Sequence, residues 1–402
     1  MRINKAEALK LLENNNILEL GQLADEKRQG FHPDSEPVTF VVDRNINYTN
    51  ICTCKCKFCA FHKDKDEKGA YVLEYQVIKR KIDELVSVEG TQLLLQGGLN
   101  PDIPLEYYLK LITNLRKDYP NLTIHSFSPS EISFIAKNNN LTPQKLLEMF
   151  IECGLSSIPG GGAEILCDEI RQKISPNKIS SQEWLDIMEI AHNLGLKTTA
   201  TMVFGFGENY EHVVEHLFKI RDLQDKTGDF TAFIPWTFAP FEGYSSPLAQ
   251  ELTNCHPEEE QSDDVRIYPS LDSSANSKLD RLPRRLFEAP RNDNITLISL
   301  AMTKKFSATA HDYLKILAVS RLVLDNIPNI QASWVTQGLK IAQLSLRFGA
   351  NDFGGTMLEE NVVKAAGISN RTTINEIIDN IQKAGFKAAQ RDTTYRIIKN
   401  FD

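Results

Sequence analysis

The sequence lacks both a long apolar run and a concentration of basic residues. No stretch of about 18 consecutive apolar residues occurs, which excludes a membrane-spanning helix. The net charge is -8 and no segment is rich in Lys and Arg, so non-specific nucleic-acid binding is disfavoured. Residues 1–20 lack the uninterrupted apolar core of a signal peptide. We therefore expect a cytoplasmic protein whose partners include neither nucleic acid nor a membrane.

Cysteine is also scarce, and its distribution is uneven. The 402-residue chain has seven cysteines, and four of them lie within the segment CTCKCKFC: Cys52, Cys54, Cys56 and Cys59. Thiols stay reduced in the cytoplasm, which argues against disulfides. Clustered cysteines in that compartment indicate a metal-binding or catalytic site.

Short β-rich apolar segments recur along the chain, and amphipathic stretches follow them. Eight such units predict a (β/α)₈ barrel of the TIM type, with a doubly wound α/β sheet as the alternative. Most of the segments are nearly continuously apolar, as in a parallel sheet buried on both faces. The predicted strands cover residues 38–45, 91–98, 122–129, 156–162, 198–206, 230–238, 330–335 and 351–355. In a barrel, the chemistry belongs at the carboxyl ends of the strands.

Two segments fall outside this pattern. Residues 4–29 predict one or two helices before the first strand, so we expect an N-terminal helical extension over 1–37 and the barrel over 38–402. From about residue 254 to 300 the sequence is rich in Ser, Asp, Arg and Pro and has no sustained period. Long structureless connections are uncommon within a compact domain. We therefore expect a largely disordered insertion in the loop after the sixth strand.

The spacing within the cysteine segment separates three thiols from the fourth. Cys52, Cys56 and Cys59 have the spacing C-x3-C-x2-C, and three thiolates on one loop can hold three irons of a [4Fe–4S] cluster. The fourth iron is then open to a small chelating molecule. Zinc is the alternative, since it takes thiolate and imidazole ligands. Its ligands would be His62, Cys59, Cys56 and either Cys52 or Cys54. Cys54 otherwise has no role, and an exposed thiol there would be liable to oxidation.

A cysteine loop of this spacing after a first barrel strand resembles that of the radical S-adenosylmethionine (SAM) superfamily. In that superfamily the three cysteines bind three irons and SAM chelates the fourth. The resemblance thus implies a [4Fe–4S] cluster and SAM as cofactors, with Phe58 at the usual aromatic position. Over residues 38–250 and 305–398, phrases such as LLLQGGLNPD, HSFSPSEI, SIPGGGAEIL and NDFGGTMLEENVV are similar to the family that cyclises dehypoxanthine futalosine in menaquinone biosynthesis. The related alternatives are aminofutalosine synthases and F0 synthases.

This resemblance implies a radical oxidoreductase. A 5′-deoxyadenosyl radical from SAM would remove hydrogen from the ribose C4′ of dehypoxanthine futalosine. The carbon radical would add to the benzoate ring of the substrate, and loss of one electron and one proton would give cyclic dehypoxanthine futalosine. An electron donor such as flavodoxin or ferredoxin is the implied partner. A zinc-stabilised barrel without enzymatic activity is the alternative from another class.

Residues at the predicted strand ends are candidates for binding the cofactors. The superfamily carries a Gly-Gly motif at the end of the second strand that faces the SAM ammonium, and glycines let a backbone approach a ligand closely. Here Leu99 replaces the Glu that usually follows. Residues of the third and fourth strand ends could bind the SAM ribose and amine. The predicted set is Phe58, Gln96, Gly97, Gly98, Ser128, Glu131 and Glu164.

The remaining candidates concern the substrate. A carboxylate of the last βα loop could accept the ring proton as a general base. The residues of that type are Asp352, Glu359 and Glu360. An arginine could pair with the substrate carboxylate, and the sequence does not choose among Arg171, Arg347 and Arg391. His125 and the strand tryptophans either contact the substrate or fill the core. The predicted substrate-binding set is His125, Arg171, Trp236 and Trp334.

Overall fold

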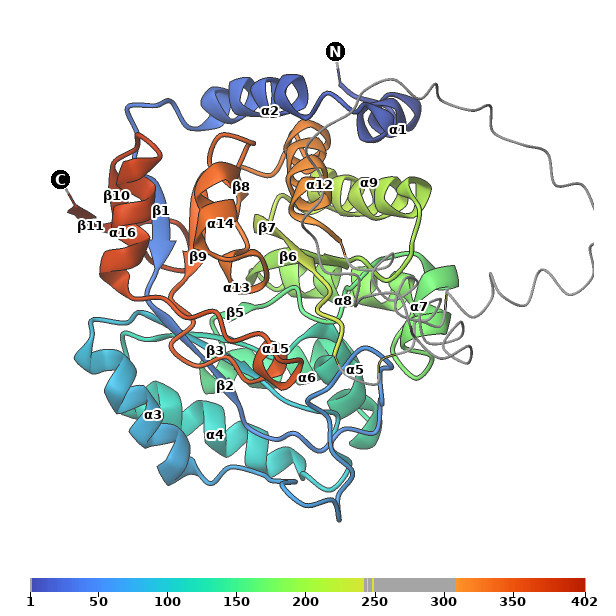
Figure 1. The fold of residues 1–402 in the computed structure, drawn as a ribbon. Coiled ribbons are helices and arrows are strands. Elements are labelled where there is room, and N and C mark those ends of the chain that lie inside the picture. Colours follow the sequence, from blue (N-terminus) through green and yellow to red (C-terminus); the bar gives the residue numbers. More distant parts are fainter. Residues whose placement is uncertain (1, 242–243, 245–247, 249–307, 402) are drawn as a thin grey trace, which may run out of the picture. The chain divides into compact units, whose positions relative to one another are not determined.

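Seven parallel strands, in the order in which they occur in the sequence, form the main sheet of the computed structural model. They are β2 (Asp43–Asn47), β3 (Gln92–Gln96), β4 (Thr123–Ser126), β5 (Ser157–Ile158), β6 (Lys197–Phe204), β7 (Phe230–Thr237) and β8 (Asn329–Ile330). A doubly wound sheet would reverse its strand order, whereas a barrel keeps it. The predicted α/β barrel is thus confirmed (Figure 1).

A smaller sheet completes the barrel. Its order is β11 (Ile397–Phe401), β10 (Ala388–Arg391), β1 (Val38–Val41), β9 (Asp352–Gly355). β1 pairs in parallel with both β9 and β10 and continues through Val42 into β2. A parallel bridge between Gln331 and Asp352 connects the chain after β8 to β9. The hairpin of β10 and β11 was not predicted from the sequence.

The described residues form fourteen helices, most of which cover the outside of the sheet, while two short ones contribute residues to the barrel interior. They are α1 (Lys5–Glu13), α2 (Ile17–Phe31), α3 (Tyr75–Ser87), α4 (Leu105–Asp118), α5 (Pro129–Asn138), α6 (Pro143–Cys153), α7 (Asp168–Ile174), α8 (Ser181–Asn193), α9 (Tyr210–Thr227), α12 (Ala310–Val323), α13 (Trp334–Gln337), α14 (Leu339–Ser345), α15 (Val362–Ala365) and α16 (Ile374–Lys383). The N-terminal pair lies on the barrel helices, α1 against α9 and α12, and α2 against α12 (Figure 1).

The structure describes residues 2–241, 244, 248 and 308–401, and the predicted insertion at 254–300 lies outside these described residues. Within the described part, no helix combines the length and the apolar character needed to cross a bilayer.

A buried ion pair ties the strands of the smaller sheet together. The Asp352 carboxylate accepts hydrogen bonds from Arg391 Nε at 2.5 Å and Nη2 at 2.9 Å. The hydroxyl of Thr39 on β1 donates to the same carboxylate at 2.5 Å. Asp352 and Arg391 are both fully or almost fully buried. These hydrogen bonds join side chains of β1, β9 and β10 and so hold the three strands in register. Loss of one charged partner would leave the other charge buried and unpaired, which is costly.

We predict that Asp352→Ala lowers the free energy of unfolding by about 3–5 kcal/mol, the usual cost of leaving a buried charge without its partner. Urea denaturation measures the difference. Asp379→Ala is the matched control, because its ion pair with Lys383 lies on the surface with both side chains more than half exposed. The control should change stability by less than about 1 kcal/mol. An equally small change for Asp352→Ala would refute the role of the pair.

Candidate active site

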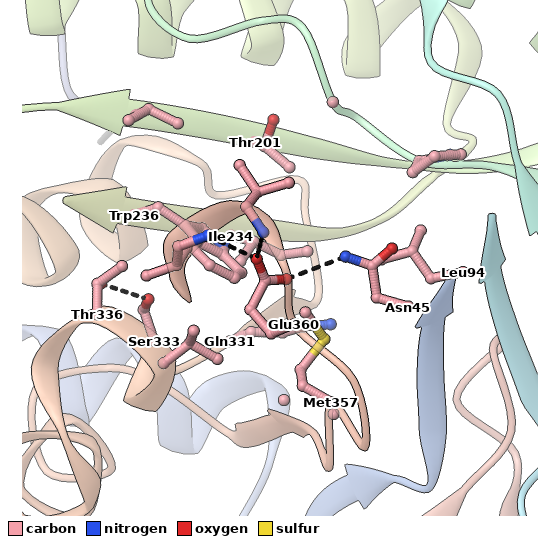
Figure 2. Close-up of a pocket in the computed structure, with 18 of the residues that line it drawn as sticks. Asn45, Leu94, Thr201, Ile234, Trp236, Gln331, Ser333, Thr336, Met357 and Glu360 are labelled. Carbon is pink, nitrogen blue, oxygen red and sulfur yellow. Dashed lines mark hydrogen bonds between the residues drawn. The ribbon is translucent and has the colours of Figure 1, made fainter. Parts of the chain in front are cut away.

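A cavity of about 360 Å³ lies inside the barrel, within the range of small-molecule sites. Alternate residues of each strand point inward, so the wall consists of one face of the strands. In Figure 2, side chains from β2, β3, β6 and β7, and from the segments after β8 and β9, surround this space. The inward-facing residues of the first two of these strands are Asp43, Asn45, Gln92, Leu94 and Gln96.

The cysteine segment lies in the loop that follows β2, at the carboxyl end of the barrel. Phe58 and Cys59 border the cavity. The loop is anchored by backbone hydrogen bonds, from Cys52 N to Lys63 O at 3.2 Å and from Lys57 N to Ile174 O at 2.9 Å. The predicted ligand loop and the cavity are therefore in direct contact.

The two glycines that follow β3 allow the cysteine loop to pack closely on the strand end. A Cβ atom on Gly98 would lie 2.2 Å from the Ile51 carbonyl oxygen and 2.8 Å from Cys52 Cβ. A Cβ atom on Gly97 would lie 2.5 Å from the ring of Tyr48. These contacts give both glycines a role in positioning the loop. Their predicted contact with SAM stays a prediction.

Glu131 joins the ends of three strands beneath the loop. Its Oε1 accepts hydrogen bonds from the Tyr48 hydroxyl at 2.7 Å and from Gly97 N at 2.9 Å. Its Oε2 accepts from Ser128 N at 2.8 Å and from Ser128 Oγ at 2.7 Å. Burial raises the pKa of this carboxyl. Neither Ser128 nor Glu131 is among the described residues that border the cavity, and their predicted contact with SAM stays a prediction.

Glu164, by contrast, borders the cavity and has one oxygen without a hydrogen bond among the described residues. Its Oε1 accepts a hydrogen bond from Lys178 Nζ at 2.7 Å. No hydrogen bond within the described residues reaches the buried Oε2, from which Arg171 Nη1 lies 3.6 Å away. Lys178 Nζ also lies 5.5 Å from the centre of the Phe58 ring. Glu164 therefore forms ion pairs with both Lys178 and Arg171 and has one buried oxygen without a hydrogen bond.

Cys54, the fourth cysteine of the segment, is buried. It is therefore not the exposed thiol that was considered from the sequence. Its Sγ lies 3.4 Å from Cys56 Sγ. Donation from the Cys54 thiol, with the positive charge of Lys178, lowers the pKa of Cys56 to about 7. Burial raises the pKa of the Cys52 and Cys59 thiols.

The donor set fits a cluster better than a single zinc ion. Within the described residues, no three His, Cys, Asp or Glu side chains are grouped as one metal ion requires. In a [4Fe–4S] cluster each thiolate binds a different iron, so such convergence is not needed. The two other described cysteines lie outside this segment. Cys153 ends α6 and so lies toward the amino end of β5, and Cys167 contacts Glu215 of α9.

Two of the three predicted general bases form ion pairs and do not themselves border the cavity. Glu359 pairs with Arg44 at 3.0 Å and with Lys81 at 2.6 Å. Asp352 is held by Arg391, and neither carboxylate is among the described residues that border the cavity. These contacts assign both residues to the support of the barrel.

The third, Glu360, does border the cavity. Its Oε2 accepts a hydrogen bond from Asn45 Nδ2 at 3.0 Å, and its Oε1 accepts from the amides of Val362 and Val363 at 2.7 and 2.8 Å. Figure 2 shows this carboxylate between β2 and the start of α15. Both oxygens are therefore engaged.

Of the three arginine candidates, Arg391 borders the cavity. Arg347 has a side chain that is 42% exposed and pairs with acidic residues on the surface. Arg171 uses its five N–H groups for three backbone carbonyls, those of Gly162, Ala163 and Ile179. Its guanidinium thus supports the glycine turn and has no free donor for a substrate carboxylate.

His125, Trp236 and Trp334 all border the cavity. The Ser157 hydroxyl donates to Lys197 O at 2.6 Å, so it accepts from His125 Nδ1 at 2.8 Å. His125 Nε2 is then the unprotonated nitrogen. Trp334 does not lie on a strand as predicted, because β8 ends at Ile330 and Trp334 begins α13.

Asp43 borders the cavity but was not predicted as a site residue from the sequence. The signal was present, since an aspartate interrupts the apolar run VTFVVDRN of the first predicted strand. A charged residue in such a run is rarely buried without a partner or a function.

The comparisons agree with this site. Residues 46–220 match the radical SAM superfamily, and residues 287–401 match the CofH/MqnC C-terminal region. The cyclic dehypoxanthine futalosine synthase of Halalkalibacterium halodurans is 40% identical over 402 residues, which cover 100% of this chain and 93% of that protein. The chain belongs to the CofH/MqnC family of radical SAM enzymes. Its cofactors are accordingly a [4Fe–4S] cluster and SAM.

A second relative in this CofH/MqnC group has another name. The 5-amino-6-(D-ribitylamino)uracil--L-tyrosine 4-hydroxyphenyl transferase of Methanocaldococcus jannaschii is 37% identical over 404 residues, covering 99% of this chain and 97% of that protein. Methylornithine synthase (PylB) has the same fold, with a TM-score of 0.64, 17% identity and coverage of 97% and 95%. The C-terminal family match begins at residue 287, inside the segment predicted as an insertion.

We predict that Cys56→Ser abolishes the [4Fe–4S] cluster, because it removes one of three thiolates that each bind an iron. Cys54→Ser is the matched control on the same loop and should keep the cluster. Iron content and cluster absorbance after anaerobic reconstitution measure both. Cluster loss in Cys54→Ser with retention in Cys56→Ser would reverse the assignment.

We further predict that Gly98→Ala reduces iron content severalfold while the barrel still folds, because the new Cβ atom displaces Ile51 and Cys52. Gly30→Ala on α2 is the control, since nothing lies within 4 Å of its added Cβ atom. Circular dichroism and iron analysis of both variants give the comparison. Wild-type iron content in Gly98→Ala would contradict the packing role of the glycine.

Proposed function

We propose that this enzyme converts dehypoxanthine futalosine to cyclic dehypoxanthine futalosine for menaquinone biosynthesis. The observation that carries the proposal is the 40% identity, along the whole chain, with a synthase of that name. The second candidate is the 4-hydroxyphenyl transfer named for the relative that is 37% identical. Aminofutalosine synthesis is a third reaction of similar type.

The upper part of the cavity supports the binding of both cofactors. We propose that Cys52, Cys56 and Cys59 bind the cluster. The Glu164 carboxylate, whose Oε2 lacks a hydrogen bond, suits the amino group of SAM, and Gln96 borders the same cavity. The bound cluster and SAM supply a 5′-deoxyadenosyl radical. The enclosed barrel interior then keeps water away from the radical chemistry.

The lower part of the cavity suits an aryl carboxylate. Trp236 and Trp334 provide apolar faces for an aromatic ring. Arg391 has three of its five N–H groups engaged, two with Asp352 and one with Asp392 O at 3.0 Å. Its remaining donors can pair with the benzoate carboxylate of the substrate.

We predict that the reconstituted protein, with SAM, dithionite and dehypoxanthine futalosine under anaerobic conditions, forms a product that is lighter than the substrate by two hydrogen atoms. One hydrogen leaves in the abstraction step, and a proton and an electron leave on rearomatisation. Mass spectrometry detects this product together with 5′-deoxyadenosine. Dithionite replaces the physiological donor, which we propose is a flavodoxin or ferredoxin.

Parallel incubations test the alternatives. One contains tyrosine and 5-amino-6-(D-ribitylamino)uracil, and another contains the substrate of aminofutalosine synthase. Cys56→Ser protein is the control in each incubation, because it should not cleave SAM. Turnover of an alternative substrate alone would overturn the proposed function.

A further inference from the structure

Asp43 differs from the other carboxylates of the cavity wall in its contacts. Among the described residues, Asp43, Glu164 and Glu360 are the carboxylates that border the cavity. Glu164 is paired with Lys178, and Glu360 accepts three hydrogen bonds. Asp43 Oδ1 accepts from Met357 N at 2.8 Å, whereas no hydrogen bond within the described residues is made by Oδ2. One carboxylate oxygen of Asp43 is thus available to a ligand.

The strand register places Asp43 below the level of the cysteine loop. Asp43 pairs with Gln92 at the start of β3, and Asn47 pairs with Gln96 at its end. Four residues along β2 correspond to about 13 Å at the usual rise of a strand. The cysteine loop begins after Asn47, so a SAM-sized ligand can lie between the loop and Asp43. Asp43 therefore lies at the depth of the substrate and not at the depth of the cluster.

The surroundings of Asp43 suit a catalytic base, because they do not hold its carboxylate in a permanent ion pair. Gly355 contributes no side chain, and a Cβ atom there would lie 2.3 Å from Asp43 Oδ1. The charged groups that act on Asp43 are Arg391 of β10 and Asp352 of β9, and His125 of β4 borders the same cavity. Arg391 is engaged by Asp352, so it only partly offsets the burial of Asp43.

These surroundings shift the pKa values of Asp43 and His125, the two groups here that could accept a proton. Burial raises the pKa of Asp43 to about 6, against the opposing effects of the Met357 amide and Arg391. Burial, with Arg391, lowers the pKa of His125 to about 3. At neutral pH Asp43 is the stronger base, although it is still ionised.

We infer that Asp43 is the catalytic base that removes the ring proton after cyclisation, an inference that rests on the proposed function. Once the C4′ radical has added to the ring, the attacked ring carbon still has its hydrogen. The C–H bond breaks, its proton passes to Asp43 Oδ2, and its electron pair stays in the ring. One electron then leaves to an acceptor of the iron–sulfur class, which restores the aromatic ring. Asp43 becomes a neutral carboxylic acid.

We predict that the ratio of cyclic product to 5′-deoxyadenosine depends on pH in the wild-type enzyme. A base with a pKa of about 6 is protonated and inactive below that pH. The ratio should therefore fall as the pH is lowered from 7 to 5, while substrate-dependent 5′-deoxyadenosine still forms. A constant ratio over this range would overturn the inference, and this measurement needs no variant that could fail to fold.

Asp43→Asn keeps the size of the side chain and removes its basicity. The ratio should fall about 100-fold and lose its pH dependence. Asp43→Ala leaves a space that formate can enter, and formate should restore product in this variant but not in Asp43→Asn. Asp392→Asn is the matched control, because its carboxylate bonds Thr394 and Arg396 near the surface. The control should keep the wild-type ratio.

Two failures can be told apart. If wild-type protein forms no cyclic product from dehypoxanthine futalosine, the proposed function fails. If wild-type protein forms it and Asp43→Asn gives an unchanged ratio, only the role of Asp43 fails. Cluster absorbance and SAM binding of each variant report on its fold.

Discussion

The four hydrogen bonds that the buried Glu131 carboxylate accepts are the contact on which the placement of the site depends. Hydrogen bonds to a charged acceptor each contribute about 1.5–3 kcal/mol, and these bonds join β2, β3 and the start of α5. They fix Tyr48 against Gly97, and Gly98 in turn fixes Ile51, the residue before the first cluster cysteine. The cysteine loop is therefore positioned by rigid strand ends, as a site that must hold a ligand in one geometry requires.

The cavity distributes its buried charges toward two ends. Lys178 pairs with Glu164 beside the cysteine loop, and Arg391 pairs with Asp352 at the lower end. Trp236 and Trp334 contribute aromatic side chains to the cavity wall. Unpaired charges inside a barrel are costly, so each cation of these pairs has a carboxylate partner.

The strand order could be predicted from the sequence because it depends on local patterns, and the prediction of the cluster cysteines rests on a pattern of the same kind. Buried parallel strands give continuous apolar runs, and the C-x3-C-x2-C spacing occurs on one loop. The roles of Asp352 and Glu359 could not be predicted, because their partners Arg391 and Arg44 are 39 and 315 residues away. The β10–β11 hairpin was missed for a related reason, since its short strands become stable only by pairing with β1.

The two levels of the cavity also suggest which residues should differ between enzymes of this family that catalyse different reactions. Two relatives with different named activities are 40% and 37% identical to the chain, so overall identity does not separate them. Under the proposed function, radical formation takes place at the upper level, beside Cys59 and Glu164. The lower level, with Asp43 and Arg391, would then contact the group that the radical attacks. A change of reaction on this barrel should therefore require different residues at the lower level, while the upper level can stay the same.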